Sequence, residues 1–247
     1  MAGAAPLTLF LIPGILCDAR VWASQRAALA DLADVRVAEH GMRSTLPALA
    51  EDILEKAPAR FAVAGHSMGG RIALEVFRAA PERVAGIALM DTGHHPFPVG
   101  EAGKREADGR FRLLAKARTE GMRAMAGEWV QKMVHPARLS DTALINSVLD
   151  MFEAQTPELY AAQIHAMLNR PDGGPLLGQI KCPALVLCGH EDAWSPAARH
   201  HDMATRIPGS MLVDIPNCGH MSTLERPEAV NEAMRAWLHK VIESERR

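Results

Sequence analysis

A serine flanked by glycines is the residue best suited to covalent chemistry in this sequence of 247 residues. Ser67 stands in Gly65-His66-Ser67-Met68-Gly69, between an apolar run at 61–64 and a helix-like repeat at 71–77. A serine at such a strand-to-helix turn adopts a strained backbone conformation that exposes its hydroxyl above the sheet. The flanking glycines lack a Cβ, so the strand and the helix can approach closely. The pattern predicts that Ser67 is a nucleophile rather than a structural turn residue.

A serine hydroxyl attacks well only when a neutral imidazole accepts its proton and a carboxylate orients that imidazole. Asp192 follows a predicted strand at 183–188, and His220 follows one at 211–215, so they are the candidate acid and base. Glu191 and Asp91 are alternative acids, because Glu191 is adjacent and Asp91 follows a neighbouring strand. The competing interpretations are that Asp192 only caps the next helix and that His220 only bonds to backbone.

Strands and helices alternate over most of the chain. Apolar runs predict strands at 7–12, 35–38, 60–64, 84–90, 183–188 and 211–215. Helical periodicity predicts helices at 19–30, 46–57, 68–79, 196–207 and 227–242. This alternation predicts an α/β fold with a mostly parallel sheet flanked by helices, whose strand ends share one edge where ligands bind.

The alternation stops between residues 90 and 182, where the patterns are helical. Helices are predicted at 101–120, 122–133, 140–152 and 157–168, followed by a turn-rich stretch at 170–175. An insertion leaving the carboxyl end of one strand would lie over the catalytic edge and exclude water. We therefore expect a core of residues 1–93 and 179–247 and a helical cap of residues 94–178.

The order serine, aspartate, histidine along the chain is that of the α/β-hydrolase fold. Three motifs support the resemblance: GHSMGG at 65–70, GHEDAWSP at 189–196 and NCGHMSTLERPE at 217–228. The sequence resembles the capped α/β-hydrolases, especially the bacterial carboxylesterase branch, and is similar to the pimeloyl-carrier-protein methyl ester esterases. The resemblance implies a carboxylic ester hydrolase that forms an acyl-enzyme on Ser67, with His220 as base and Asp192 as orienting acid.

The resemblance also implies an oxyanion hole made of backbone N–H groups. Met68 supplies one donor and Ile15 the other, with Leu16 as the second choice. The family usually has His-Gly at the start of this loop, whereas this sequence has Pro13, so the support of the loop must differ. Trp22 is interpreted as a packing residue.

Composition and charge exclude several other functions. Lys and Arg number 27 against 29 Asp and Glu, a formal net charge of −2, which argues against a nucleic-acid partner. The first apolar run is too short for a membrane span, and no basic region precedes it, so we expect a cytoplasmic protein. The four cysteines have no ligand spacing and are expected to be reduced. The pairs His94-His95 and His200-His201 lack a carboxylate-spaced set, so neither a metal nor any other cofactor is expected.

The expected substrate is a small-molecule ester. Five cap methionines, which could line an apolar acyl pocket or fill the core, are Met122, Met125, Met133, Met151 and Met167. Residues 103–123 carry seven bases and three acids, and this +4 segment could dock an acyl carrier protein or form a solvated helix face. His94 and His95 could reach the pocket mouth or belong to a turn.

Two other functions fit the same residues. One is hydrolysis of a C–C bond by the same triad, and the other is a hydrolase-fold ligand receptor with little turnover. The acyl length, the alcohol group, transfer to acceptors other than water, the cap residues at the pocket and the oligomeric state have no signature in the sequence.

Overall fold

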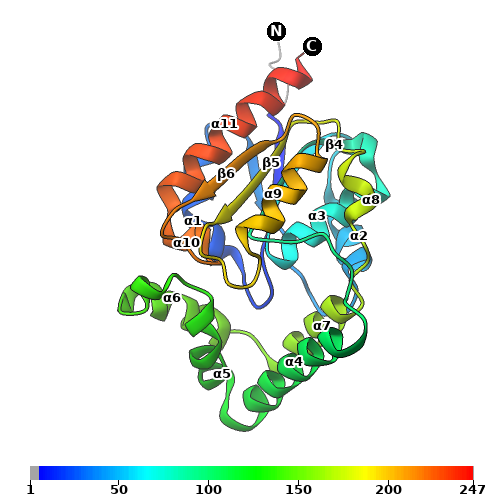
Figure 1. Cartoon of the computed structure of the whole chain (residues 1–247). Helices are drawn as coiled ribbons and strands as arrows, with labels where there is room; N and C mark the ends of the chain where they lie inside the picture. Colours follow the sequence, from blue (N-terminus) through cyan, green and yellow to red (C-terminus); the bar gives the residue numbers. More distant parts are fainter. Residues whose placement is uncertain (1–5, 247) are drawn as a thin grey trace.

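One sheet of six parallel strands forms the centre of the fold (Figure 1). The computed structural model describes residues 6–246, so the interpretation of residues 1–5 as free of a targeting signal lies outside the described residues, as does residue 247. The strand order is β2-β1-β3-β4-β5-β6. The strands are β1 (Thr8–Ile12), β2 (Asp34–Val37), β3 (Phe61–His66), β4 (Val84–Met90), β5 (Ala184–Gly189) and β6 (Met211–Ile215).

All six predicted strands are present, and the predicted α/β class with a parallel sheet is confirmed. The four inner strands are buried at every position, which explains their continuous apolar runs. The edge strands β2 and β6 are partly exposed and carry charged residues. Because every pairing is parallel, the carboxyl ends of the strands, and the loops that follow them, meet at one edge of the sheet.

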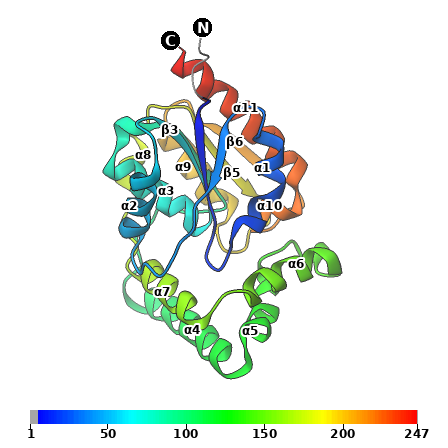
Figure 2. The same ribbon diagram turned by 180° about the vertical axis from the view of Figure 1, so that it is seen from behind.

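Helices cover both faces of the sheet (Figures 1 and 2). On one face lie α1 (Ala23–Leu29), α10 (Ser222–Glu225) and α11 (Pro227–Glu245). On the other lie α2 (Leu46–Lys56), α3 (Met68–Ala79), α8 (Gly174–Leu177) and α9 (Ala197–Arg206). The predicted helix at 19–30 is divided, because a 3₁₀ turn, η1 (Ala19–Trp22), precedes α1; another, η2 (Pro81–Arg83), precedes β4.

Four further α-helices lie between β4 and β5, beyond the carboxyl edge of the sheet (Figure 1). They are α4 (Gly100–Glu120), α5 (Met122–Trp129), α6 (Thr142–Glu153) and α7 (Pro157–Leu168), with 3₁₀ turns η3 (Val130–Lys132) and η4 (Pro136–Arg138) between α5 and α6. Helix α6 begins later than predicted because the Asp141 side chain caps it by accepting the N–H of Leu144. The division at residues 94 and 178 stays a prediction, and α8, which it assigns to the cap, packs against α3.

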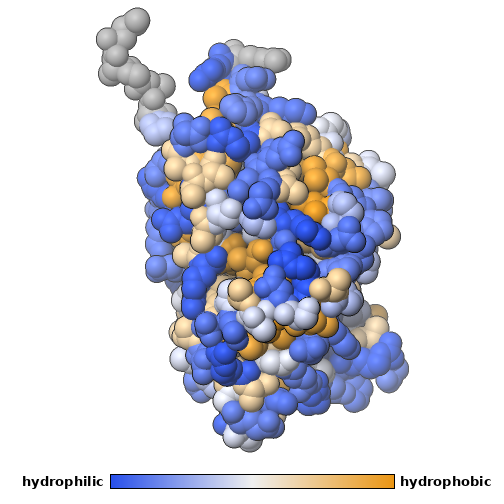
Figure 3. Space-filling view, turned by 90° about the vertical axis from the view of Figure 1, so that its left-hand side faces the viewer, coloured by the Kyte–Doolittle hydropathy of each residue, from blue (hydrophilic) through white to orange (hydrophobic). Residues whose placement is uncertain are grey.

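Large apolar side chains lie mostly inside the molecule. Among the described residues, the exposed large hydrophobic side chains are Met42, Val99, Phe111 and Leu212. On the face seen in Figure 3, hydrophobic areas are small and interrupted by hydrophilic residues. Within residues 6–246, every helix is too short or too polar to span a lipid bilayer.

Close backbone contacts at two glycines join β1, β3 and α3. A Cβ on Gly65 would lie 2.1 Å from the carbonyl oxygen of Gly69, and a Cβ on Gly69 would lie 2.1 Å from that of Ile12. Both distances are far below van der Waals contact, and the obstructing atoms are backbone. Only glycine allows α3 to begin this close to the sheet.

Replacement of Gly69 by alanine should therefore lower the free energy of unfolding by at least about 2 kcal/mol, since rigid backbone must move. The matched control is Gly127→Ala in α5, where a Cβ would meet nothing within 4 Å. This change should raise the free energy of unfolding by up to about 1 kcal/mol through helix propensity. Chemical denaturation of both variants checks the pair, and equal effects would contradict the packing argument.

Candidate active site

Ser67 occupies the turn between β3 and α3 in a conformation that non-glycine residues rarely adopt. Its φ is 57° and its ψ is −117°. Two hydrogen bonds hold this backbone: the Ser67 N–H donates to the Met90 carbonyl over 2.8 Å, and the Thr92 hydroxyl donates to the Ser67 carbonyl over 2.6 Å. Strain of this kind costs on the order of 1–3 kcal/mol and persists where the surroundings enforce it. The strained turn aims the Ser67 hydroxyl at the loops beyond the sheet edge.

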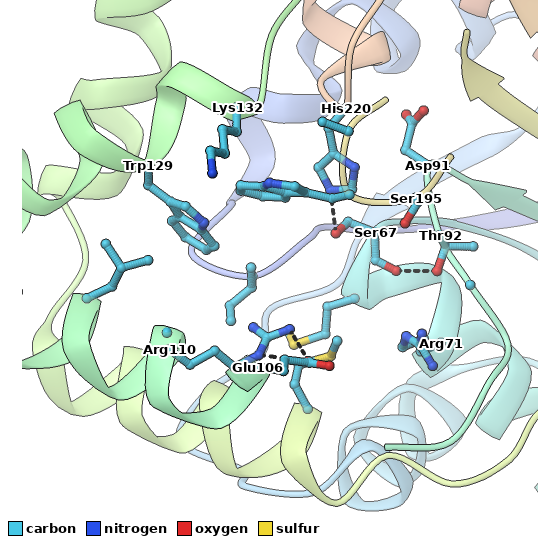
Figure 4. Close-up of a pocket in the computed structure, with 18 of the residues that line it drawn as sticks. Ser67, Arg71, Asp91, Thr92, Glu106, Arg110, Trp129, Lys132, Ser195 and His220 are labelled. Atoms are coloured by element: carbon cyan, nitrogen blue, oxygen red, sulfur yellow. Dashed lines mark hydrogen bonds and ion pairs between the residues drawn. The ribbon is translucent and has the colours of Figure 1, made fainter. Parts of the chain in front are cut away.

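The structure brings Ser67, His220 and Asp192 into one hydrogen-bonded chain. Ser67 Oγ lies 2.8 Å from His220 Nε2 (Figure 4), and His220 Nδ1 lies 2.7 Å from Asp192 Oδ2. The other carboxylate oxygen, Asp192 Oδ1, accepts the N–H groups of Trp194 and Ser195. A carboxylate fixed on both oxygens holds Nδ1 protonated, which leaves Nε2 to accept the serine proton.

The electrostatics of the hydrogen-bonded residues Ser67, His220 and Asp192 suit His220 to act as a base. Burial lowers the pKa of His220, but the charge of Asp192 and its hydrogen bond outweigh burial and raise that pKa above its ordinary value. Burial favours the neutral form of Asp192, but the charge and hydrogen bond of His220 outweigh it and lower the pKa of Asp192. The pair therefore stabilises an imidazolium next to an ionised carboxylate.

The alternative acids have other partners. Asp91 Oδ1 accepts the Gly189 N–H over 2.9 Å, and Asp91 Oδ2 accepts the Ser222 hydroxyl. Complete burial, together with the negative charge of Asp192, raises the pKa of Asp91 above its ordinary value. Glu191 accepts the Cys218 N–H over 3.0 Å. Of the three candidate acids, Asp192 is the one bonded to His220.

The loop carrying His220 is held by groups that the sequence did not identify. Glu225 accepts the N–H groups of Gly219 and His135, over 3.0 and 2.8 Å. The His220 N–H donates to the Met133 carbonyl over 2.7 Å. The segment after α5 thus fixes the histidine loop directly. Glu225 lies within the quoted motif at 217–228, but a backbone acceptor such as Met133 leaves no signature in a sequence.

The two candidate oxyanion donors of the loop after β1, Ile15 and Leu16, have different surroundings. Ile15 and Met68 both line the pocket beside Ser67. Met68 is the first residue of α3, where an N–H has no acceptor within the helix. The Leu16 N–H instead donates to Gln163 Oε1 of α7 over 2.8 Å, which leaves Ile15 as the candidate. Leu16 itself has a φ of 58°.

The loop that begins at Pro13, where the family usually has histidine, is supported by His40. The Pro13 carbonyl lies 2.8 Å from Nε2 of His40, a buried residue that follows β2. The support therefore comes from the segment after the neighbouring strand. His66 bonds through Nε2 to the His220 carbonyl, and burial lowers its pKa to about 3. Trp22 is fully buried, as expected of a packing residue.

A pocket of about 670 Å³ opens above Ser67 and His220, between the sheet edge and helices α4, α5 and α7. Two tryptophans form an aromatic wall next to the base: Trp194 lies 4.9 Å from the His220 ring, and Trp129 stacks on Trp194 at 5.1 Å. Figure 4 shows Trp129 and Arg71 on opposite sides of Ser67. The ring of Trp194 shields His220 from solvent.

Of the two interpretations of the five methionines at 122–167, core filling holds for four and pocket lining for one. Met167 lines the pocket, whereas Met122, Met125, Met133 and Met151 are buried in the hydrophobic core and do not line it. His94 does not reach the pocket mouth; its ring bonds to Arg206. Among the described residues, no group of three or more His, Cys, Asp or Glu side chains could hold a metal ion.

Most charges of the basic segment at 103–123 are neutralised locally. Five of its seven bases have carboxylate partners within the described residues: Lys104, Arg110, Arg112, Lys116 and Arg123. Most of these partners are exposed, so the pairs contribute little to stability. They do reduce the field that this segment presents to an acidic partner.

The two buried aspartates near His220 permit a matched test. Asp192→Asn should lower kcat by about a thousandfold to ten-thousandfold, because the amide can no longer stabilise the imidazolium. Asp91→Asn should lower kcat by less than tenfold, since Asp91 bonds to Gly189 and Ser222 and not to the His220 ring. Steady-state ester hydrolysis measures both variants. A larger loss in Asp91→Asn than in Asp192→Asn would contradict the assignment of the acid.

The raised pKa of His220 predicts how the rate of hydrolysis depends on pH. The base must be neutral in the free protein, so kcat/KM should rise with pH through the pKa of His220 and then level off. Because this pKa is raised, the midpoint should lie above the ordinary value of 6.5. A pH–rate profile checks this, with circular dichroism at each pH to exclude unfolding. A midpoint at or below 6.5 would show that Asp192 does not govern the histidine.

Known proteins resemble this chain in sequence and in fold. The sequence model described as the alpha/beta hydrolase family matches residues 9–233. A solved thermophilic esterase from Thermogutta terrifontis, with malate bound, has a TM-score of 0.84 and is 31% identical, covering 96% of this chain and 91% of that one.

Relatives of similar sequence include enzymes with different named activities. The dihydrolipoyllysine-residue acetyltransferase component of the acetoin cleaving system of Pseudomonas putida is 30% identical over 97% of this chain, which spans 65% of that protein's length. The pimeloyl-[acyl-carrier protein] methyl ester esterase of Nitrosomonas europaea is 28% identical over 74% of this chain and 73% of its own length. The 2-hydroxy-6-oxononadienedioate/2-hydroxy-6-oxononatrienedioate hydrolase of Escherichia coli K12 is 25% identical over 82% and 71%.

Proposed function

Since this chain belongs to the alpha/beta hydrolase family, we propose that it is a serine hydrolase that cleaves carboxylic esters through an acyl-enzyme on Ser67. The observation that carries the proposal is the hydrogen-bonded chain from Ser67 Oγ through His220 to Asp192, with bonds of 2.8 and 2.7 Å. The similarity to an esterase of known structure supports ester substrates.

In the first step, Ser67 Oγ attacks the ester carbonyl while its proton passes to His220 Nε2. The N–H groups of Met68 and Ile15 would stabilise the oxyanion that forms, and each such donor is typically worth about 10² to 10³ in rate. When the bond to the alcohol breaks, His220 returns the proton to the leaving oxygen. The acyl group is then bonded to Ser67.

In the second step, water attacks the acyl-enzyme and gives its proton to His220. The tetrahedral intermediate expels Ser67 Oγ, which recovers the proton, and the carboxylic acid leaves. The helices at 94–178 would act as a cap that limits water around the acyl group. The contact between Met133 and His220 supports this role, because it joins this segment to the base.

Hydrolysis of a C–C bond is a second candidate. The 25% identity to the 2-hydroxy-6-oxononadienedioate/2-hydroxy-6-oxononatrienedioate hydrolase motivates it. An acyl carrier protein is a candidate partner because one relative acts on a carrier-bound methyl ester. On the basic segment, Arg105 and Arg118 are the exposed bases without a carboxylate partner among the described residues, so we expect small-molecule esters to be the better substrates.

Release of p-nitrophenol from short and medium acyl esters tests the proposal. The wild-type protein should show steady turnover, and Ser67→Ala should lower kcat by at least about a thousandfold. Ser147→Ala is the control, since that hydroxyl bonds only to the Leu144 carbonyl in α6, away from the pocket.

Three outcomes would overturn the ester proposal. Retained turnover in Ser67→Ala would remove the acyl-enzyme. A single burst without turnover would indicate a ligand receptor. Cleavage of a dienoic C–C substrate with a kcat/KM above that of every ester would favour the second candidate.

A further inference from the structure

Two guanidinium groups from different elements meet at the wall of the catalytic pocket. Arg71 belongs to α3, Arg199 belongs to α9, and both line the pocket. A Cβ added to Gly93, which follows β4, would lie 3.0 Å from Arg199 Nη1 and 3.1 Å from Arg71 Nη2. The two groups are thus near enough to contact one small anion together.

Neither guanidinium has a carboxylate partner among residues 6–246. Arg71 Nη1 donates to the His95 carbonyl over 2.8 Å, and Arg199 Nη1 donates to the Trp194 carbonyl over 3.4 Å. Arg71 is only 8% exposed, so water does not replace the missing counter-ion over most of its surface. A buried cation without a counter-ion is costly and is usually paired.

Two other arginines of the pocket, Arg110 and Arg170, are different because they are paired. Glu106 accepts two hydrogen bonds of 2.7 Å from Arg170 and two more from Arg110. Burial favours the neutral form of Glu106, but the hydrogen bonds from Arg170 and the charge of Arg110 outweigh burial and lower its pKa to about 2. Figure 4 shows Glu106 next to Arg110, with Arg71 apart from both.

The balance of charge around the two guanidinium groups is positive. Burial, followed by the charges of Arg170 and Arg199, lowers the pKa of Arg71 to about 9, which still leaves its guanidinium charged at neutral pH. The acid that acts on Arg71 is Glu106, which is already bonded to Arg170 and Arg110. The charge of Asp192 acts on Arg199, but Asp192 is bonded to His220. Four arginines thus share two carboxylates that already have other partners.

We propose that Arg71 and Arg199 form an anion subsite that binds a carboxylate carried by the ester substrate. The inference rests on the proposed esterase function and adds the class of substrate. Guanidinium groups match carboxylates with paired, charge-assisted hydrogen bonds. The preferred substrates are then monoesters of dicarboxylic acids.

The position of Arg71 limits where that carboxylate lies. Its guanidinium lies near Gly93, and the adjacent residue Thr92 donates a hydrogen bond to the Ser67 carbonyl over 2.6 Å. A carboxylate bound there belongs to a substrate with few atoms between its charged end and its scissile ester. A phosphate at the end of a long carrier arm would instead lie near the mouth of the pocket.

A pair of substrates that differ only in charge tests the subsite. For each protein, kcat/KM is measured for the monomethyl ester and for the dimethyl ester of the same dicarboxylic acid, and the ratio of the two is compared. This ratio cancels any general loss of activity. The wild-type ratio should be at least tenfold in favour of the monoester, after correction for the two ester groups of the diester.

The ratio should fall at least tenfold in Arg71→Met and in Arg199→Met, and Arg71→Lys should recover part of it. Arg118→Met is the matched control, because Arg118 is exposed on α4 outside the pocket, and its ratio should match the wild type within twofold. A wild-type ratio near one, or equal ratios in Arg71→Met and Arg118→Met, would overturn the subsite.

Binding to the inactive Ser67→Ala protein keeps the test decisive if the buried Arg71 variants fail to fold. Calorimetry should give a Kd at least tenfold lower for the monoester than for the diester, and inorganic phosphate should compete more weakly than the free dicarboxylate. Equal affinities, or stronger competition by phosphate, would refute a carboxylate subsite. Turnover by Ser67→Ala would refute the acyl-enzyme while leaving the binding preference measurable, so the two failures are distinguishable.

Discussion

The strained turn at Ser67 is the constraint on which the rest of the site depends. A positive φ at a residue with a side chain is unfavourable, and here neighbouring groups of the sheet hold it: the carbonyl of Met90 and the hydroxyl of Thr92. Gly65 and Gly69 let α3 start against the backbone of β1. The same turn orients the hydroxyl toward His220 and brings the free N–H groups of α3 to the place where an oxyanion would form. The turn that joins β3 to α3 therefore also positions the nucleophile.

The remaining groups reach Ser67 because parallel strands end at a common edge. Asp192 and His220 follow β5 and β6, and the loop after β1 supplies Ile15. The helices between β4 and β5 do more than cover this edge. The carbonyl of Met133 accepts the N–H of His220, and Gln163 accepts that of Leu16, so the segment between β4 and β5 bonds to both the histidine loop and the loop after β1. A movement of this segment would therefore change the geometry of both loops, as well as access to the pocket.

The sequence was sufficient for the fold and for the candidate triad because their signals are local. Apolar runs identified every strand among the described residues, and Ser67, Asp192 and His220 each stand in a short motif just after a strand. The contacts that sequence reasoning missed join distant residues through backbone atoms, as between His40 and Pro13, and such atoms carry no residue-specific pattern. The sequence left open whether the methionines at 122–167 line the pocket or fill the core, because helical spacing does not reveal which face of a helix turns toward the pocket. The meeting of Arg71 and Arg199 depends on the packing of α3 and α9 around Gly93, which no spacing encodes.

The central claim is that His220 makes the Ser67 oxygen nucleophilic. Covalent labelling by a p-nitrophenyl alkylphosphonate ester, followed by peptide mass mapping, tests it most directly. The account predicts one adduct per chain, on Ser67, and labelling at least about a hundredfold slower in His220→Ala. An adduct on another residue, or a labelling rate that the loss of His220 leaves unchanged, would contradict it.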